Sequence, residues 1–382
     1  MQPFTTNQVP RIVAGPGRSN EIGAIVTELA GTGACVLLVA DNGLTGIGLT
    51  QRIAGVLKDG GHRVVTHDAI LSDPKEPAVA EAVRIARQEG VGAVVCLGGG
   101  SALDAGKLVA AMIGARGNLE DYRLAAAALP VARVPLVCVP TTAGTGSEAT
   151  AVSVISDAGG TKYWYWAPAL KPDVALLDAR LTTGLPPQLT AACGVDAIVH
   201  AMEAATGRAA FAENSRICHE AIRLATSHID RAVAEPNDLE ARGAMLLAAT
   251  WAGIGIDNAG TGMAHNIAHA LASLVPIHHG RAVAIGMAAS LGWSMEGEEE
   301  AYTEVARAFG CAHYGELPMA FSGLVRRLGI RLSLAADTNR LPPERLAARM
   351  AAPENAPMRA ASRRLVTDED LLLLAERALG FG

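Results

Sequence analysis

The chain has 382 residues, a length typical of two domains that can each bury a core. Half of the residues are hydrophobic and only 18% are charged, which excludes a largely disordered protein. The formal net charge is −6 and no long basic run occurs, so neither nucleic acid nor an anionic membrane is expected as a partner.

Targeting and membrane signals are not expected in this sequence. Residues 1–15 lack the charged and apolar regions of a signal peptide. The longest apolar runs, at 244–256 and 282–295, are shorter than the ~20 residues of a membrane helix and predict buried helices. The six cysteines occur singly, without a CxxC motif, and are interpreted as reduced core residues. We therefore expect a cytoplasmic protein.

Between residues 10 and 180, short β-branched runs alternate with helical patterns. The predicted strands cover 34–40, 63–67, 92–97, 134–139 and 174–178, and the predicted helices cover 19–30, 49–59, 76–89 and 102–112. Nearly continuous apolar strands with intervening helices are typical of a parallel sheet covered on both faces. Such a sheet binds ligands at the carboxyl ends of its strands.

Two loops rich in glycine and hydroxyl residues follow predicted strands of this sheet. The first, CLGGGSALDAGK (96–107), leads into a helix, so its glycines would let the backbone approach a phosphate at the helix N-terminus. It is neither a Walker A loop nor a GxGxxG motif. The second, VPTTAGTGSEAT (139–150), offers small donors and acceptors for a polyanion or a ribose. Either loop alone could be an ordinary turn, but together they predict a dinucleotide site.

Asp41 follows the predicted strand 34–40. A carboxylate at this point can bind the adenosine ribose of NAD and repel the 2′-phosphate of NADP. A turn or helix-capping role is the alternative interpretation.

The sequence pattern changes at LTTGLPP, residues 181–187, and long helical patterns follow. We predict an α/β domain at 1–184 and an all-helical domain at 185–382.

The helical half carries one aspartate and several histidines at helical spacing. Asp196 and His200 are four residues apart, as are His265 and His269. Residues at i and i+4 share a helix face, with Cβ atoms roughly 5–6 Å apart. With His279 on a third element, these pairs could converge on one cation. A carboxylate and three imidazoles suit Fe²⁺ or Zn²⁺ rather than Ca²⁺ or Mg²⁺.

Five segments of the chain resemble the iron-containing (group III) alcohol dehydrogenase family, and the resemblance spans almost the full length. The matching segments are GGGSALDAGK (98–107), PTTAGTGSE (140–148), GVDAIVHAMEA (194–204), GMAHNIAHALA (262–272) and HHG (278–280). The 13 residues between His265 and His279 also match the family spacing.

This resemblance implies a dehydroquinate synthase-like fold of class α/β plus all-α. A Rossmann-like dinucleotide-binding domain would be followed by a helical metal-binding domain, with the active site in the cleft between them. The implied activity is the NAD(P)-dependent interconversion of an alcohol and an aldehyde or ketone. NAD is the expected cofactor, with NADP as the alternative, and Fe²⁺ the expected metal, with Zn²⁺ as the alternative. The expected partners are a small alcohol or aldehyde and a second copy of the chain in a homodimer.

The resemblance also carries over to individual residues. Asp196, His200, His265 and His279 match the metal ligands of the family, and His269 matches a histidine near the nicotinamide that serves proton transfer. The expected cofactor-binding residues are Asp41, Gly98, Gly99, Gly100, Ser101, Asp104, Thr141, Thr142, Thr145, Ser147 and Lys162.

Two local features depart from the family pattern. The run KYWYW (162–166) is a candidate oligomer contact, with a plain hairpin as the alternative. Arg281 follows HHG, where the family commonly has a small or apolar residue. A guanidinium here could favour an anionic substrate, and a structural salt bridge is the alternative.

Other functions are also compatible with the sequence. A maleylacetate reductase-like enzyme would reduce a keto acid without a metal, although the full ligand set argues against it. A glycerol dehydrogenase-like zinc enzyme and a non-catalytic nucleotide or metal sensor are less favoured.

Overall fold

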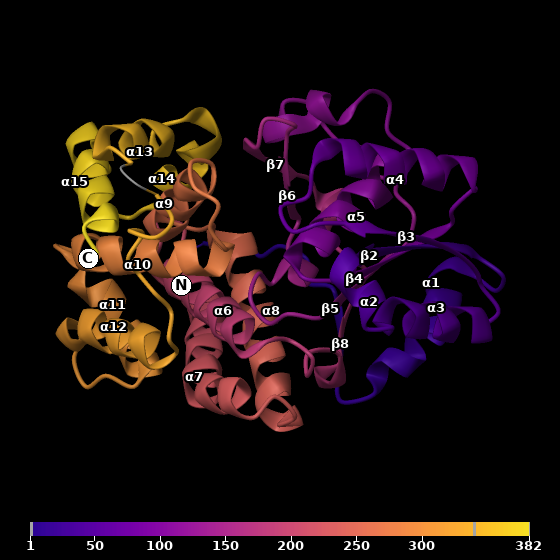
Figure 1. Cartoon of the computed structure of the whole chain (residues 1–382), viewed down its shortest axis with the longest axis horizontal. Coiled ribbons are helices and arrows are strands. Elements are labelled where there is room, and N and C mark those ends of the chain that lie inside the picture. Colours follow the sequence, from indigo (N-terminus) through magenta and orange to yellow (C-terminus); the bar gives the residue numbers. More distant parts are fainter. Residues whose placement is uncertain (1–2, 339–340, 382) are drawn as a thin grey trace. The chain divides into compact units, whose positions relative to one another are not determined.

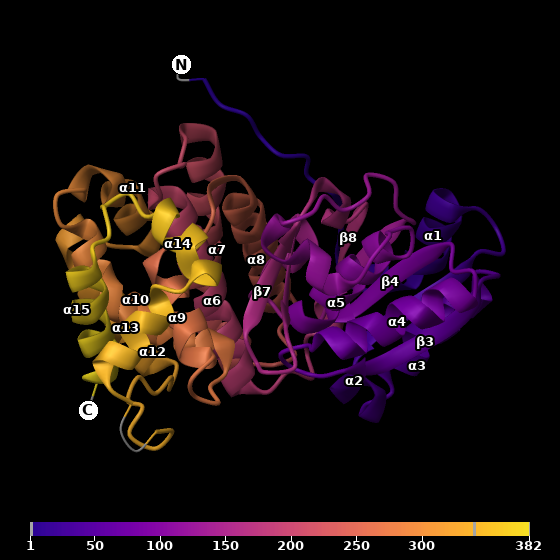
Figure 2. The same ribbon diagram turned by 90° about the horizontal axis from the view of Figure 1, so that it is seen from above.

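The computed structural model describes residues 3–338 and 341–381. Two compact units are formed, and Figure 1 and Figure 2 show them from two directions. One unit contains Gln8–Thr142 and Gly146–Gly184. The other contains the segment ending at Asn7, the short segment Ala143–Thr145, and the chain from Leu185 onward. The main change of unit, at Gly184 and Leu185, lies inside the segment where the sequence pattern changes.

The first unit is built on a six-stranded parallel sheet with the strand order β1-β8-β5-β4-β2-β3. Its strands are β1 (Arg11–Ala14), β2 (Cys35–Asp41), β3 (Arg63–Ile70), β4 (Ala93–Gly98), β5 (Leu136–Pro140) and β8 (Val174–Leu177). An antiparallel hairpin of β6 (Val152–Ser156) and β7 (Lys162–Trp166) forms a second sheet. The predicted parallel α/β half is confirmed. Strands β1 and β6 were not predicted, since both are short and only partly buried and so lack the continuous apolar run of the equally short β5 and β8.

Alternate residues of each strand bury themselves on opposite faces of the parallel sheet. Leu37 and Val39 pack with helices α4 and α5, whereas Val36 and Leu38 pack with α1 and α3. Figure 1 shows the sheet between these two pairs of helices. The helices of this unit are α1 (Ile22–Ala30), α2 (Asn42–Gly46), α3 (Leu49–Asp59), α4 (Glu76–Gln88) and α5 (Gly100–Met112).

The second unit is helical throughout the part that the structure describes. Its helices are α6 (Pro187–Thr206), α7 (Ala212–Ala234), α8 (Leu239–Ala259), α9 (Met263–Ala272), α10 (His279–Met295), α11 (Glu299–Phe309), α12 (Leu317–Arg327), α13 (Pro343–Met350), α14 (Ala356–Ala361) and α15 (Asp368–Leu379). Helices α6 to α12 share one core, and α9 and α10 pack also with α13 and α15. The predicted buried helices at 244–256 and 282–295 lie in α8 and α10. Across the described residues, no helix combines the length and the apolar character needed to cross a membrane.

Two short segments of the N-terminal half belong to the helical unit. The main-chain N–H of Asn7 donates to Asn258 Oδ1 at 2.8 Å, and Asn7 Nδ2 donates to the carbonyl of Asp257 at 2.6 Å. The second segment, Ala143–Thr145, lies in the middle of the second predicted cofactor loop, where Gly144 packs on Cys193 of α6. The division of the chain therefore differs from a single cut after residue 184.

Candidate active site

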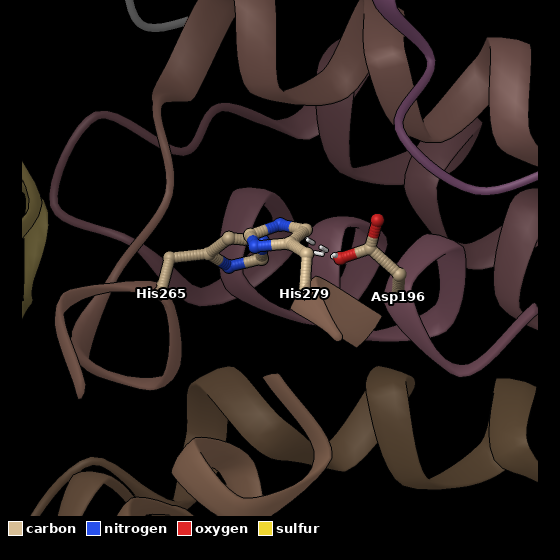
Figure 3. A group of neighbouring side chains, drawn as sticks. All are labelled: Asp196, His265 and His279. Atoms are coloured by element: carbon tan, nitrogen blue, oxygen red, sulfur yellow. Dashed lines mark ion pairs between the residues drawn. The ribbon is translucent and has the colours of Figure 1, made fainter. Parts of the chain in front are cut away.

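Three of the four predicted metal ligands bring their side chains together in the helical unit. Asp196 comes from α6, His265 from α9, and His279 is the first residue of α10. Their ligand atoms all lie within 4.8 Å of one another. The Nε2 atoms of His265 and His279 lie 3.4 and 3.6 Å from Asp196 Oδ1. Figure 3 shows both imidazoles directed at this carboxylate.

His200, the fourth predicted ligand, lies beside this cluster. It follows Asp196 by one turn of α6, and its Nδ1 is 3.8 Å from Asp196 Oδ1. Its ring stacks on that of His265, with centroids 4.3 Å apart and planes 19° apart. His200 is not a member of the group of three whose ligand atoms all lie within 4.8 Å. The i, i+4 spacing nevertheless brings it to the same carboxylate oxygen.

The chemistry of these atoms fits a cation. Asp196 and His265 are each 2% exposed, and His200 is also buried. Among the described residues, Asp196 Oδ1, His200 Nδ1 and His265 Nε2 lack a hydrogen bond of normal geometry. A buried polar atom left unpaired costs roughly 1–3 kcal/mol. A shell of one carboxylate and imidazoles suits a borderline transition metal, so this cluster is a candidate metal site.

Burial and charge act in opposite directions on the ionisable groups of the cluster. Burial lowers the pKa of His200 to about 4, because it penalises the charged imidazolium. Burial also opposes the charged form of His265, but the carboxylates of Glu203 and Asp196 raise its pKa to about 9. For Asp196, burial favours the neutral acid, yet the neighbouring histidines hold its pKa well below the usual range. Protons and a metal ion would therefore compete for the same nitrogens.

Glu203 is a member of this site that was not predicted from the sequence. Glu203 Oε2 lies 2.5 Å from His265 Nδ1, and Glu203 Oε1 accepts from the N–H of Ala264 at 2.7 Å. Asp196, His200 and Glu203 follow one another at i, i+4 and i+7 on α6, which places them along one helix face. That spacing was a signal from which Glu203 could have been found.

His269, the predicted proton-transfer residue, lies next to the cluster. It follows His265 by one turn of α9 and is half-buried. Its ring centroid is 5.6 Å from that of His279 and 6.4 Å from that of His265. It is thus adjacent to the candidate ligands without belonging to the group of three.

Several predicted cofactor residues gather at the carboxyl edge of the parallel sheet. Strands β2, β4 and β5 are neighbours, and they end at Asp41, Gly98 and Pro140. The N–H of Thr141 donates to the carbonyl of Gly98 at 2.9 Å. The chain runs outward from β2 to β3 and then returns to β4 on the other side of β2. Such a reversal of strand order marks the ligand-binding position of an open α/β sheet.

The turn from β4 into α5 requires glycine. Gly98 has a φ of +149°, and a Cβ atom there would lie 2.7 Å from Ala102 Cβ and 3.1 Å from Asp41 Cβ. Gly99 precedes Gly100, the first residue of α5, and no side chain caps this helix end. The side chain of Thr142 lies against Gly99, 3.3 Å from where a Cβ would be. The first turn of α5 is therefore suited to an anion such as a phosphate.

Asp41 has a structural contact of its own at this edge. Its Oδ1 accepts from the N–H of Gly43 at 2.9 Å and caps the short helix α2. The capping role left open by the sequence is thus present, and the ribose-binding role stays a prediction.

Asp104 and Ser147 bond to the protein rather than projecting freely toward a ligand. Ser147 Oγ donates to Asp104 Oδ1, and Asp104 Oδ2 accepts from the N–H of Val154 at 2.9 Å. Lys107, which is fully buried, donates to the carbonyl and the hydroxyl of Ser147 at 2.9 and 3.0 Å and to Thr150 Oγ1 at 3.0 Å. This network fixes the second loop against α5. Lys107, the last residue of the first glycine-rich segment, was not among the residues predicted to have a role.

Two other predicted cofactor residues, Lys162 and Thr145, belong to different units of the chain. Lys162 Nζ is 2.6 Å from Asp73 Oδ1, and the same aspartate accepts from Ser156 and Lys75. Burial favours the neutral acid of Asp73, but the charge of Lys162 and these hydrogen bonds lower its pKa to about 2. Ser101 joins this group, since its hydroxyl accepts from the N–H of Asp73 at 3.3 Å. Thr145 is part of the helical unit.

The two unusual sequence features have structural explanations. The guanidinium of Arg281 forms a bidentate salt bridge with Asp337 at 2.8 and 2.9 Å and donates to the carbonyls of Arg331 and Ser333 at 2.7 Å. It is thus the structural salt bridge left open by the sequence, and four of the five N–H groups of the guanidinium bond to the protein. The run 162–166 is strand β7 of the plain hairpin, with Tyr165 fully buried and Trp166 48% exposed.

Comparisons with known proteins cover both units. Residues 10–179 match the family described as iron-containing alcohol dehydrogenase, and residues 190–378 match the C-terminal part of the Fe-containing alcohol dehydrogenase family. A choline dehydrogenase of Bacillus subtilis (strain 168) is 32% identical over 314 residues, which are 81% of this chain and 78% of that protein. An NAD-dependent methanol dehydrogenase of Bacillus methanolicus is 32% identical over 303 residues, 79% of this chain and 78% of that protein.

The fold also matches solved structures along the whole chain. A sulfoacetaldehyde reductase from Bifidobacterium kashiwanohense, solved in complex with NAD⁺, gives a TM-score of 0.90 at 26% identity and covers 100% of both chains. These relatives are dehydrogenases and reductases that act on CH–OH groups or the corresponding carbonyls. The chain therefore belongs to the iron-containing alcohol dehydrogenase family of oxidoreductases.

Proposed function

We propose that this protein is a metal-dependent, NAD-linked alcohol dehydrogenase and aldehyde reductase. The observation that carries the proposal is the group of buried ligand atoms around Asp196 Oδ1, two of which are imidazole nitrogens without a hydrogen bond of normal geometry. Family membership gives this cluster a chemical context, and the NAD dependence of the methanol dehydrogenase and the NAD⁺ complex of the reductase support the choice of cofactor.

Asp196, His200, His265 and His279 would hold the metal, iron with zinc as the alternative. When bound, the ion supplies Lewis acidity toward the oxygen of the alcohol or carbonyl. Asp196 contributes the negative charge that balances the cation, and its burial strengthens that interaction because solvent screening is weak there. The half-buried His279 leaves this side of the cluster accessible to a small molecule.

The carboxyl edge of the parallel sheet would hold NAD, which supplies the hydride acceptor or donor. The first turn of α5 and the loop at Thr141 and Thr142 would bind the pyrophosphate through N–H and hydroxyl groups. Asp41 would bind the ribose and, through its negative charge, disfavour the 2′-phosphate of NADP. Lys162, held by Asp73, would contribute a positive charge on the same unit.

His269 would transfer the proton that accompanies hydride transfer. Oxidation of an alcohol releases one hydride from carbon and one proton from oxygen. Imidazole exchanges protons near neutral pH, and His269 is half-buried beside His279. In the reductive direction the same side chain would return the proton to the product oxygen.

The homodimer and the cytoplasmic location remain predictions. All six cysteines are free, which agrees with a reducing compartment. Light scattering on the purified protein measures the number of chains in the assembly.

The experiment that tests the proposed function measures metal content and turnover on the same preparations. We expect about one iron or zinc ion per chain in anaerobically purified protein and NADH-dependent reduction of aldehydes. His265→Ala should lose both. His228→Ala is the matched control, because the His228 ring bonds to the carbonyl of Leu224 on α7. Metal-free protein that reduces a keto acid would contradict the proposal and favour the maleylacetate reductase-like alternative.

A further inference from the structure

We infer that Glu203 is a positioning residue that holds His265 with Nδ1 protonated and Nε2 directed at the metal. The inference rests on the proposed function, because it assigns a role toward the ion that Asp196 and the histidines would bind. It goes beyond the ligand set predicted from the sequence, in which Glu203 had no role.

The ring of His265 lies between two carboxylates at unequal distances. Its Nδ1 is 2.5 Å from Glu203 Oε2, a hydrogen-bonding distance, whereas its Nε2 is 3.4 Å from Asp196 Oδ1. An imidazole in the bound state carries one proton, and the shorter contact places that proton on Nδ1. The lone pair of Nε2 then faces the carboxylate oxygen of Asp196. Two facing lone pairs repel each other unless a cation lies between them.

Glu203 is itself held in place by the protein. It is buried, and its Oε1 accepts from the N–H of Ala264, the residue before His265. A Cβ atom at Gly262 would lie 3.0 Å from the same Oε1, so the chain passes as close to this carboxylate as a glycine permits. Glu203 thus bonds the main chain at the start of α9 with one oxygen and the His265 ring with the other.

The other buried imidazole, that of His200, has a different kind of hydrogen-bond partner. Its Nδ1 faces Asp196, and its ring hydrogen-bonds the main chain of Gly144. A carbonyl is a neutral acceptor, whereas Glu203 is a charged one. A histidine that donates to a carboxylate becomes a more basic ligand, and loss of such a partner typically weakens metal binding 10- to 100-fold.

The substitution Glu203→Gln tests whether Glu203 acts through its charge and hydrogen bonds or only by filling space. Glutamine has nearly the same size, but it offers one acceptor oxygen to two donors, the N–H of Ala264 and the Nδ1–H of His265. The amide –NH₂ would therefore face one of them. Glu76→Gln is the matched control, since Glu76 is a buried carboxylate of the α/β unit bonded to Arg123 and Tyr165.

The experiment is a titration of the metal-free protein with Zn²⁺ in competition with a chromophoric chelator. We expect Glu203→Gln to bind Zn²⁺ 10- to 100-fold more weakly than the wild type, and Glu76→Gln to bind it within twofold of the wild type. A Glu203→Gln variant that is folded, as judged by circular dichroism, and binds with unchanged affinity would overturn the inference. In that case His265→Ala still loses the metal, and the proposed function stands. A wild type that binds no Zn²⁺ or Fe²⁺ at this site would overturn the proposed function and the inference together.

A second measurement needs no variant and so does not depend on the folding of Glu203→Gln. Nitrogen NMR of the wild type, labelled with ¹⁵N-histidine and loaded with Zn²⁺, reports which ring nitrogen of His265 carries the proton. A strongly hydrogen-bonded proton on Nδ1 supports the inference, whereas Zn²⁺ bound through Nδ1 refutes it.

Discussion

Substitution of Lys107 by methionine tests whether a buried ammonium group holds the loop after β5. Lys107 is fully buried, and its Nζ donates to two carbonyls and two hydroxyls of the segment 147–152, with Asp104 Oδ1 at 3.3 Å. An ammonium has three hydrogens, so three of these acceptors are served at once, at roughly 1.5–3 kcal/mol each. Methionine fills most of the volume but donates to none of them. Removal of one partner of a buried charged network costs about 3–5 kcal/mol, and we expect a loss in that range.

Hydrogen exchange of peptides from α5 and β6 measures this loss where it occurs. A loss of 3–5 kcal/mol corresponds to exchange that is faster by roughly two to four powers of ten at amides such as that of Val154. Lys58→Met is the matched control, because Lys58 is exposed on α3 and the same substitution there should change stability by about 0.5 kcal/mol or less. If Lys107→Met exchanges like Lys58→Met, the network does not hold the loop.

Three further predictions concern other residues of the two units. Gly106→Ala should destabilise the protein by at least about 1–3 kcal/mol, because the new Cβ would lie 2.2 Å from Cys96 Sγ, and Cys96→Ala in the same chain should restore most of the loss in urea unfolding. Arg281→Ala should lower the melting temperature while the ratio of NADH turnover with an anionic and a neutral aldehyde stays within twofold, and a larger change in that ratio would revive the anionic-substrate hypothesis. The lowered pKa of Asp73, about 2, means that its ionised form stabilises the fold above pH 4 and that this contribution is lost as the pH falls toward 2. The difference in melting temperature between the wild type and Asp73→Asn should therefore shrink between pH 5 and pH 2, and a difference independent of pH would contradict the assignment.

Local sequence patterns predicted the helices and strands whose hydrophobic pattern extends over enough residues to be recognised. The helix at 49–59 has the same bounds in the structure, Leu49–Asp59, because its apolar residues recur at helical spacing over three turns. The five predicted strands of the parallel sheet are present, with ends shifted by up to three residues. Strand β1 was missed because it is short and partly exposed, unlike the equally short but fully buried β8. The pairing of β6 with β7 depends on a turn that hydrophobicity does not encode.

The residue types of the candidate site could be predicted from the sequence, but the contacts that these residues make with other helices could not. The i, i+4 spacing of Asp196 and His200 is by itself enough to place them on one helix face. The contact of Glu203 with His265 joins residues 62 positions apart, and the salt bridge of Arg281 with Asp337 joins residues 56 positions apart. Such contacts are set by how the helices pack. The i, i+7 spacing on α6 places Glu203 on the face of Asp196, but it does not identify the residue of another helix that Glu203 contacts.

Hydrogen bonding distinguishes the roles of Lys107 and Asp196, which are two of the buried charged residues. Lys107 and Asp196 are buried to nearly the same degree, so both would be costly without partners. Lys107 has oxygen acceptors around it and completes a network, as expected of a residue that stabilises a loop. Asp196 Oδ1 instead faces imidazole nitrogens, two of them buried, at 3.4 to 3.8 Å, too far for a normal hydrogen bond and close enough to share a cation. A ligand that completes such an arrangement stabilises the folded chain, because binding returns the stability that the bare site lacks. Two equally buried residues can thus have different roles, a structural one for Lys107 and a ligand-binding one for Asp196. The difference lies in whether the protein itself supplies the hydrogen-bond partners.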